Sequence, residues 1–171
     1  NEPYRRFCQR RGATPRKVAG WRDIPPVPIN AFKEVTLSCE PTAACERVFM
    51  TSGTTRAEVK GRHWHPTIAV WDLSMRLNFG RRFMGTDGRL PMAILFPPET
   101  ELGNSSLARY LAQAVREFAA QGSGWYVSAQ GMDTAGLRER LRQAQRSGEP
   151  FALLGASYSF VHLMDELARD G

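Results

Sequence analysis

The chain has 171 residues, enough for one domain with a sizeable core but little for a second complete one. Its composition is 42% hydrophobic and 23% charged, as in globular proteins, and no apolar run approaches the length of a membrane span. The net charge of +6 and the pI near 9.7 favour anionic partners. Because zinc-finger spacing, a helix-turn-helix signature and aromatic RNA-stacking motifs are all missing, we expect no nucleic-acid partner.

The cysteines and the two ends of the chain set the expected context. Cys8, Cys39 and Cys45 form an odd set without a CxxC motif, so we expect neither disulfides nor a metal site. A reducing cytoplasm is the simplest setting for such a chain. The first residue is Asn1 rather than methionine, and Gly171 comes just after a helical pattern, so we expect a piece of a longer protein.

Residues 1–46 are predicted to form an N-terminal helical and proline-rich extended segment. Short basic helical pieces should be broken by Gly12 and Pro15. Residues 21–28 should lie extended, because three prolines fix φ and remove hydrogen-bond donors. One turn of helix is expected over 29–35. The expected apolar anchors of the extended stretch are Trp21, Ile24 and Val27.

Residues 47–171 are predicted to form an α/β subdomain, because strand and helix patterns alternate along them. Alternation of this kind is typical of a mostly parallel sheet with helices on both faces. The continuous apolar run at 90–96 suits a parallel strand that is buried on both sides. The other expected strands are 47–51, 125–128 and 151–154, with 61–64 returning as the second arm of a hairpin. The expected helices are 66–83, 104–122, 134–147 and 157–168.

A run of small hydroxyl residues around one glycine follows the first of these strands. Backbone amides and hydroxyls can together wrap an anion, and glycine lets the backbone approach it closely. Such a run also occurs in ordinary turns, so a structural role stays open. The run is Thr51, Ser52, Gly53, Thr54 and Thr55, and the nearby cations are Arg56, Lys60 and Arg62.

Residues 49–55 resemble the phosphate-binding motif of the adenylate-forming superfamily. This superfamily includes acyl- and aryl-CoA ligases, adenylation domains and the acyl-protein synthetases of bacterial bioluminescence. The last branch is the most similar, because three further blocks match it in the same order. These blocks are Ile24-Pro25-Pro26-Val27-Pro28 with Phe32-Lys33-Glu34, then Asn104-Ser105-Ser106-Leu107, then Leu153-Leu154-Gly155 with Phe160-Val161-His162-Leu163.

The resemblance implies part of the N-terminal domain of a carboxylate-activating ligase that uses ATP and Mg²⁺. In such enzymes a carboxylic acid, here a fatty acid, attacks the α-phosphate of ATP to give acyl-AMP. The acyl group then passes to a protein thiol, or to CoA in the sister branch. The resemblance also implies that the loop binds the β and γ phosphates and that Arg56 or Lys60 supplies the cation. No catalytic residue is assigned.

The loop departs from the superfamily pattern just after its second threonine. The pattern has a glycine and then a Pro-Lys pair, whereas this chain has Arg56, Glu58 and Val59, with Lys60 one position late. A second hypothesis is therefore a non-catalytic scaffold or interaction module that keeps the fold with a degenerate phosphate loop.

Two further groups are candidates for the wall of a substrate or nucleotide crevice, because both follow strands of the predicted sheet. In open α/β sheets, ligands bind beyond the carboxyl ends of the strands. For each group the alternative is structural, a helix cap for the first and a strand-to-helix turn for the second. His65 is a candidate to contact phosphate or substrate, whereas His63 and His65 lack further ligands for a metal. The groups are Asn104, Ser105 and Ser106, and Gly155, Ala156 and Ser157.

Overall fold

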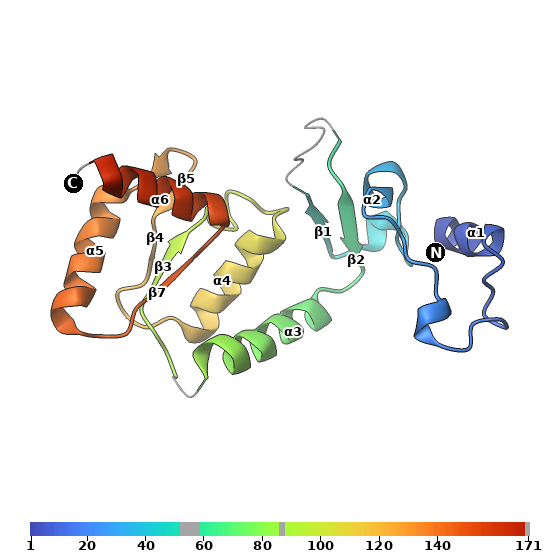
Figure 1. Ribbon diagram of the computed structural model, residues 1–171, viewed down its shortest axis with the longest axis horizontal. Coiled ribbons are helices and arrows are strands. Elements are labelled where there is room, and N and C mark those ends of the chain that lie inside the picture. Colours follow the sequence, from blue (N-terminus) through green and yellow to red (C-terminus); the bar gives the residue numbers. More distant parts are fainter. Residues whose placement is uncertain (52–58, 86–87, 170–171) are drawn as a thin grey trace. The chain divides into compact units, whose positions relative to one another are not determined.

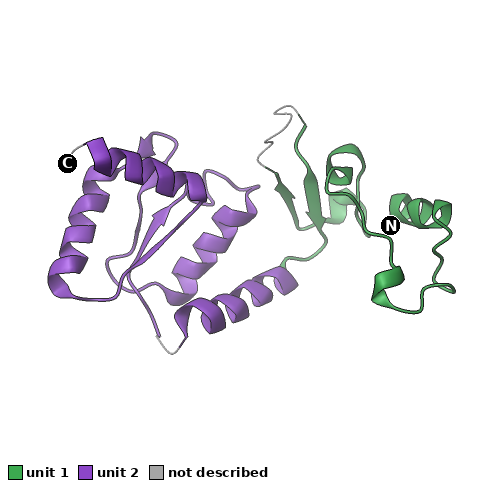
Figure 2. Cartoon of the chain, viewed as in Figure 1, with its two compact units in different colours: residues 1–68 green, residues 69–171 purple. Residues whose placement is uncertain are grey.

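The structure is a computed structural model, and it describes residues 1–51, 59–85 and 88–169 (Figure 1). The chain divides into two compact units, unit 1 of residues 1–68 and unit 2 of residues 69–171 (Figure 2). Each unit is described by itself below. The division expected after residue 46 stays a prediction.

Unit 1 contains short helices followed by one hairpin. The first helix begins behind Asn1, whose side chain accepts a hydrogen bond from the Tyr4 amide, and ends before Gly12 at φ +68°. The expected anchors Trp21 and Ile24 are wrong, because their side chains are 75% and 50% exposed. The elements are α1 (Glu2–Arg10), η1 (Trp21–Asp23), α2 (Ala31–Glu34), η2 (Thr42–Ala44), β1 (Arg47–Met50) and β2 (Arg62–His65).

The hairpin predicted from the sequence is confirmed. Strands β1 and β2 pair in antiparallel register, with Arg47 opposite His65 and Met50 opposite Arg62. Phe49 is buried in β1 and anchors the hairpin in unit 1. The alternation of strands and helices had placed residues 47–51 in the parallel sheet, and this expectation is wrong: β1 pairs with β2 instead.

Unit 2 is an α/β structure built on a short parallel sheet, as the sequence predicts. Strand β3 (Met92–Leu95) lies in the middle, with β4 (Gly124–Trp125) and β7 (Ala152–Gly155) parallel on its two sides. All four residues of β3 are buried, which explains the continuous apolar run. The stretch expected as one strand at 125–128 is interrupted, because β5 (Val127–Ser128) leaves the sheet and pairs with β6 (Gly131–Met132).

Helices cover both faces of this sheet, and Figure 1 shows its strands running between α4 and α5. Met92 and Ile94 pack in the cluster formed with α3 (Ala69–Phe79) and α4 (Ser106–Phe118). Ala93 and Leu95 pack in the second cluster with α5 (Thr134–Ser147) and α6 (Ser157–Arg169). The alternation of side chains along β3 therefore builds one core layer on each face.

Helix α3 begins later than expected, and glycines and caps mark other helix ends. α3 begins at Ala69, three residues after Pro66, and the Ile68 amide just before it donates to the Glu46 carboxylate at 2.9 Å. It continues as the π-turn η3 (Gly80–Met84), which Gly85 ends at φ +59°. Asp133 caps α5, and Gly148 ends it in the left-handed region.

The apolar pattern of α6 does not by itself show which face is buried. Val161 and Met164 belong to this pattern, but they are 54% and 64% exposed. Leu163 is buried in their place, and Phe160 packs beside it. Helix α6 carries apolar residues on opposite faces, so periodicity alone could not identify the inner one.

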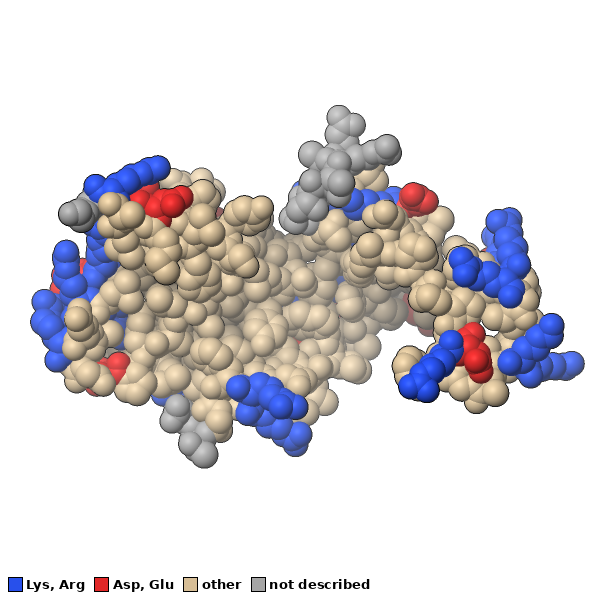
Figure 3. Space-filling view, viewed as in Figure 1, with Lys and Arg blue, Asp and Glu red and all other residues tan. Residues whose placement is uncertain are grey.

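Basic side chains gather over α1 and the segment after it, over α5, and in a further group that includes Arg81 and Arg82 of η3 (Figure 3). Several of those on α5 bind protein groups: Arg140 donates to the Gly122 carbonyl and Arg146 to the Glu139 carboxylate. None of the helices in the described part of the chain combines the length and the apolar character needed to cross a bilayer.

Candidate functional site

The hydroxyl-rich loop leaves the end of the hairpin in unit 1. The Thr51 amide donates to the Gly61 carbonyl at 3.0 Å, and the Gly61 amide donates to Thr51 Oγ1 at 3.0 Å. Thr51 therefore extends the hairpin pairing by one residue. Its amide is used within the protein, whereas its hydroxyl hydrogen can still be donated to a ligand.

Two cations follow the hydroxyl-rich run in the sequence. Lys60 and Arg62 are exposed, and within the part of the chain that the structure describes neither side chain forms an ion pair. Both are therefore available to an anion. The other residues proposed for phosphate binding lie outside the described residues, and they are Ser52, Gly53, Thr54, Thr55 and Arg56.

The two histidines of β2 are held by aromatic contacts. The ring of His63 stacks on Phe32 with centroids 4.2 Å apart, and His65 meets the edge of Phe49 at 5.1 Å. Burial and, to a smaller extent, the neighbouring His63 lower the pKa of His65. The lowered pKa favours the neutral imidazole, which can offer a hydrogen bond but no positive charge. Within the described residues, no three His, Cys, Asp or Glu side chains are placed to hold a metal ion.

In unit 2, the carboxyl ends of β3 and β7 meet at one edge of the sheet. Leu95 and Gly155 are paired, so the segments that follow them start side by side. A Cβ on Gly155 would lie 2.7 Å from the Leu95 carbonyl oxygen. The close backbone approach at Gly155 is thus made by β3 itself. Ala156 starts α6 by accepting hydrogen bonds from the Ser159 and Phe160 amides, and Ser157 is the first helical residue.

The candidate residues after β3, at positions 104–106, include the cap of a helix. Ser105 is the N-cap of α4, and its Oγ accepts a hydrogen bond from the Ala108 amide at 3.2 Å. The expectation that Asn104 caps this helix is wrong by one residue, because Ser105 holds the extended backbone that a cap needs. Ser106 is the first residue of the helix, so its amide is one of the donors at the positive end of the α4 dipole.

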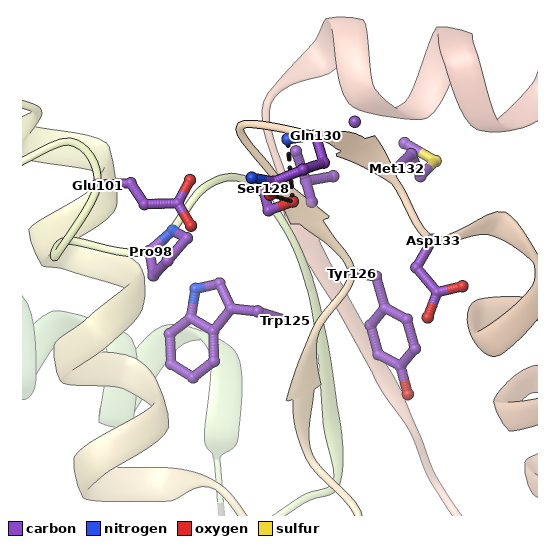
Figure 4. Close-up of a pocket in the computed structure, with 10 residues that line it drawn as sticks. Pro98, Glu101, Trp125, Tyr126, Ser128, Gln130, Met132 and Asp133 are labelled. Carbon is purple, nitrogen blue, oxygen red and sulfur yellow. Dashed lines mark hydrogen bonds between the residues drawn. The ribbon is translucent and has the colours of Figure 1, made fainter.

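A hollow of about 340 Å³ lies beyond the same edge, between the segment after β3 and the β5–β6 hairpin (Figure 4). Glu101 joins the two walls, because its carboxylate accepts a hydrogen bond from the Ala129 amide at 2.8 Å. In Figure 4 the Trp125 ring lies below Pro98, and Tyr126 lies beside Asp133. The residues around the hollow are Pro98, Glu101, Trp125, Tyr126, Val127, Ser128, Gln130, Gly131, Met132 and Asp133.

The chemistry of this hollow suits an uncharged group better than a phosphate. None of the ten residues around it is Lys or Arg. The two carboxylates already accept hydrogen bonds, Glu101 from Ala129 and Asp133 from the Gly136 amide at 2.9 Å. What remains is aromatic and aliphatic surface with a few polar groups, which is typical of sites for small organic molecules.

The sequence did not predict this hollow, because it did not predict the β5–β6 hairpin that forms one of its walls. Residues 125–128 had been interpreted as one strand. The turn between β5 and β6 has a recognisable signal, since Ser128 Oγ accepts from the Gln130 amide and Gly131 has φ +117°. A Ser-x-x-Gly pattern after an apolar run could have indicated the turn.

An ion-pair network fixes the segment that leads to this hollow. Arg109 of α4 binds the Asp72 carboxylate of α3 through two nitrogens and the Glu99 carboxylate through the third, at 3.1 Å. Partial burial alone would raise the pKa of Asp72, but the hydrogen bonds and charge of Arg109 outweigh it and lower that pKa. The network therefore ties two helices to the loop after β3.

The candidate residues thus fall into two groups that the structure describes separately. The hairpin group belongs to unit 1, and the sheet-edge group belongs to unit 2. The second group has the position that ligand sites take in α/β proteins with parallel sheets. By its fold and by this sheet edge, the chain is an α/β protein with a parallel sheet.

Comparison with curated proteins finds a long-chain-fatty-acid–luciferin-component ligase of Vibrio harveyi, 25% identical over 166 residues. The match covers 96% of this chain and 42% of the relative, so the chain spans less than half of that protein's length. At this identity the match supports an adenylate-forming-like relationship at most. No protein-family profile matches the chain, and no solved structure matches it.

Proposed function

We propose that this chain is the N-terminal part of an ATP-dependent carboxylate-activating ligase that forms acyl-AMP from a fatty acid. The acyl group would then pass to a protein thiol, with CoA as the alternative acceptor. The observation that carries the proposal is the similarity to the Vibrio harveyi ligase over nearly the whole chain. The hydroxyl-rich motif at the end of the hairpin supports the same reaction class.

In this proposal the hairpin end binds the polyphosphate of ATP. The residues given this role are Thr51, Ser52, Gly53, Thr54 and Thr55. Among the described residues, the Thr51 hydroxyl, Lys60 and Arg62 fit a polyphosphate, because they supply one donor and two exposed cations. ATP with Mg²⁺ would supply the activated phosphate, while the protein would act by positioning and by stabilising negative charge.

The sheet edge of unit 2 would receive an uncharged part of the substrates. Its aromatic hollow lacks cations, so an acyl chain or a nucleoside ring fits it better than a phosphate does. Ser106 and Ser157 begin helices beside this edge, where backbone amides are available to polar groups of a substrate.

A non-catalytic scaffold is the second candidate function, and one observation favours it. The Thr51 amide donates its hydrogen bond to the Gly61 carbonyl. It is therefore not available to bind a phosphate together with the other amides of the loop. Together with the altered sequence after Thr55, this suits a protein that keeps the fold without binding ATP.

Calorimetric titration of MgATP into the natural full-length polypeptide separates the two candidates. The ligase should bind MgATP saturably and release pyrophosphate only when a fatty acid is present. Lys60→Ala should weaken MgATP binding about tenfold or more, because a hydrogen bond to a charged group is lost. Lys17→Ala is the matched control, because Lys17 is an exposed lysine in the segment that follows α1.

Thr54→Ala combined with Thr55→Ala should abolish the pyrophosphate release. Unchanged release in that variant would remove the loop from the mechanism. A wild-type protein that gives no heat with MgATP would instead support the scaffold. Product analysis with CoA and with protein acceptors then identifies the destination of the acyl group.

A further inference from the structure

A cavity of about 850 Å³ lies within unit 1, between α1 and the segment that follows it. The chain turns at Gly12, and a hydrogen bond of 3.0 Å from the Tyr4 hydroxyl to the Pro25 carbonyl joins the two sides. Sites for small organic molecules usually enclose about 300–1,000 Å³. The cavity is therefore large enough for such a ligand, and no residue of the β1–β2 hairpin lines it.

Backbone hydrogen bonds shape the wall opposite α1. The Ala13 amide donates to the Cys8 carbonyl at 3.0 Å, directly after the end of the helix. The Val18 amide donates to the Thr14 carbonyl at 3.1 Å, which forms a turn in the next stretch. The segment after α1 is thus folded into turns, and these give the cavity a defined wall.

Most of the cavity is lined by side chains without charge. Ile24 is one of them, and it is 50% exposed. A large aliphatic side chain gains free energy when it is removed from water, so a ligand that covers Ile24 with apolar atoms is favoured. The lining therefore suits a ligand with a hydrocarbon part. Its uncharged members include Tyr4, Cys8, Ala13, Val18, Ile24 and Pro25.

The charged residues of the lining are arginines. Arg5 lies 2.5 Å from the Glu2 carboxylate, so its charge is already balanced. Arg16 is exposed, and among the described residues its side chain forms neither an ion pair nor a hydrogen bond. None of the described residues that line the cavity is Asp or Glu. The cavity thus offers one guanidinium group to a ligand, and no carboxylate of the lining repels an anion.

One unpaired guanidinium beside an apolar lining matches a ligand with one negative charge and a hydrocarbon chain. A carboxylate carries a single charge at pH 7 and can accept two parallel hydrogen bonds from a guanidinium. A phosphate monoester carries nearly two charges, and Arg16 alone would leave one of them unbalanced. We propose that this cavity binds an aliphatic carboxylate, with its acid group at Arg16 and its chain against Val18 and Ile24.

Protection of Cys8 from alkylation tests the proposal, because this partly exposed thiol lines the cavity. The 171-residue chain is treated with iodoacetamide, with and without decanoate, and peptide mass spectrometry follows each cysteine. We expect decanoate to slow alkylation of Cys8 saturably, by at least about threefold, because a bound ligand of this kind covers most of the lining. Cys39 and Cys45 are internal controls, since neither lines the cavity, and their rates should not change.

The head group and the chain of the ligand are tested separately. 1-Decanol has the same chain without the charge, and it should need about two- to fivefold higher concentrations, the range for a solvent-accessible ion pair. Decyltrimethylammonium should need higher concentrations still, because Arg16 repels it. Hexanoate keeps the acid with a shorter chain and should protect Cys8 less well than decanoate, because it covers less apolar surface.

Two pairs of variants locate the ligand. Arg16→Ala should weaken the protection by decanoate about two- to fivefold, whereas Arg10→Ala, at an exposed arginine outside the lining, should not. Ile24→Ser should weaken it at least about threefold through lost apolar contact, whereas Ile29→Ser, at a 71% exposed position outside the lining, should not. Without ligand, Cys8 should be alkylated at the wild-type rate in every variant.

Unchanged alkylation of Cys8 in decanoate below its micelle concentration overturns the proposal. Equal protection by decanoate and decyltrimethylammonium also overturns it, because the cavity would then bind hydrocarbon without recognising the acid. Equal slowing of all three cysteines would reveal a nonspecific detergent effect and would likewise overturn the site. The experiment contains no ATP, and Cys8 does not line the sheet-edge hollow of unit 2, so failure here leaves the ligase proposal intact.

Discussion

Gly155 provides the sharpest test of the sheet edge. In Gly155→Ala the new Cβ would lie 2.7 Å from the Leu95 carbonyl oxygen and 2.8 Å from Leu95 Cβ. Both atoms belong to the fully buried centre of the sheet, so relief requires β3 and β7 to move apart. Overpacking of this kind typically costs about 1–3 kcal/mol. Because the clash involves backbone atoms, we expect Gly155→Ala to destabilise the folded sheet by about 2–3 kcal/mol. The equilibrium constant for opening of the sheet would then be about 30- to 140-fold larger.

Amide hydrogen exchange of β3 measures this loss within unit 2. Gly103→Ala is the matched control, since its nearest heavy atom is 3.8 Å away and its φ is not positive. The control should stay within about 0.5 kcal/mol of wild type. If Gly155→Ala protected β3 as well as the control does, the close approach of the two strands would be refuted, and a ligand-facing role for Gly155 would regain support.

Two further predictions concern the helices beside this edge. Ser105→Ala should destabilise unit 2 by about 1 kcal/mol in urea denaturation, and Asn104→Ala by clearly less, because Ser105 is the cap; equal losses would contradict that assignment. Asp72→Asn should destabilise unit 2 at pH 7, since partial burial of the carboxylate is outweighed by Arg109, which lowers the pKa of Asp72. That stability is present above the ordinary pKa of about 3.9 and is lost as the pH falls through the lower folded value, so the variant should approach wild type in acid. A difference that stays constant from pH 7 to about pH 3 would contradict the pKa direction.

Parts of the fold were predictable because local signals and tertiary packing agree there. The uninterrupted apolar run of β3 indicated a strand covered on both faces, and both of its core layers are present. Asp133 and Gly148 marked the two ends of α5 through capping chemistry. Where the local signal was ambiguous, tertiary packing decided, as in α6, where Leu163 rather than Val161 is buried.

Less of the candidate site could be predicted, because its residues depend on how segments meet. The sequence correctly placed two groups after strands β3 and β7, and Leu95 and Gly155 do end side by side. It indicated a helix cap among residues 104–106 but not that Ser105 forms it, and it did not reveal that the β5–β6 hairpin encloses a hollow beside Glu101. The hollow depends on a hydrogen bond between residues 28 positions apart, which leaves no periodic pattern in the sequence.

The two-sided apolar character of α6 has a practical consequence for work with the purified chain. Three large apolar side chains of α6 are exposed to solvent, those of Tyr158, Val161 and Met164. Exposed apolar patches of this kind promote self-association. Light scattering should therefore increase with concentration for the wild-type chain, and Val161→Lys should suppress the increase without loss of helix content. Biophysical measurements on this protein should accordingly use dilute samples or that variant.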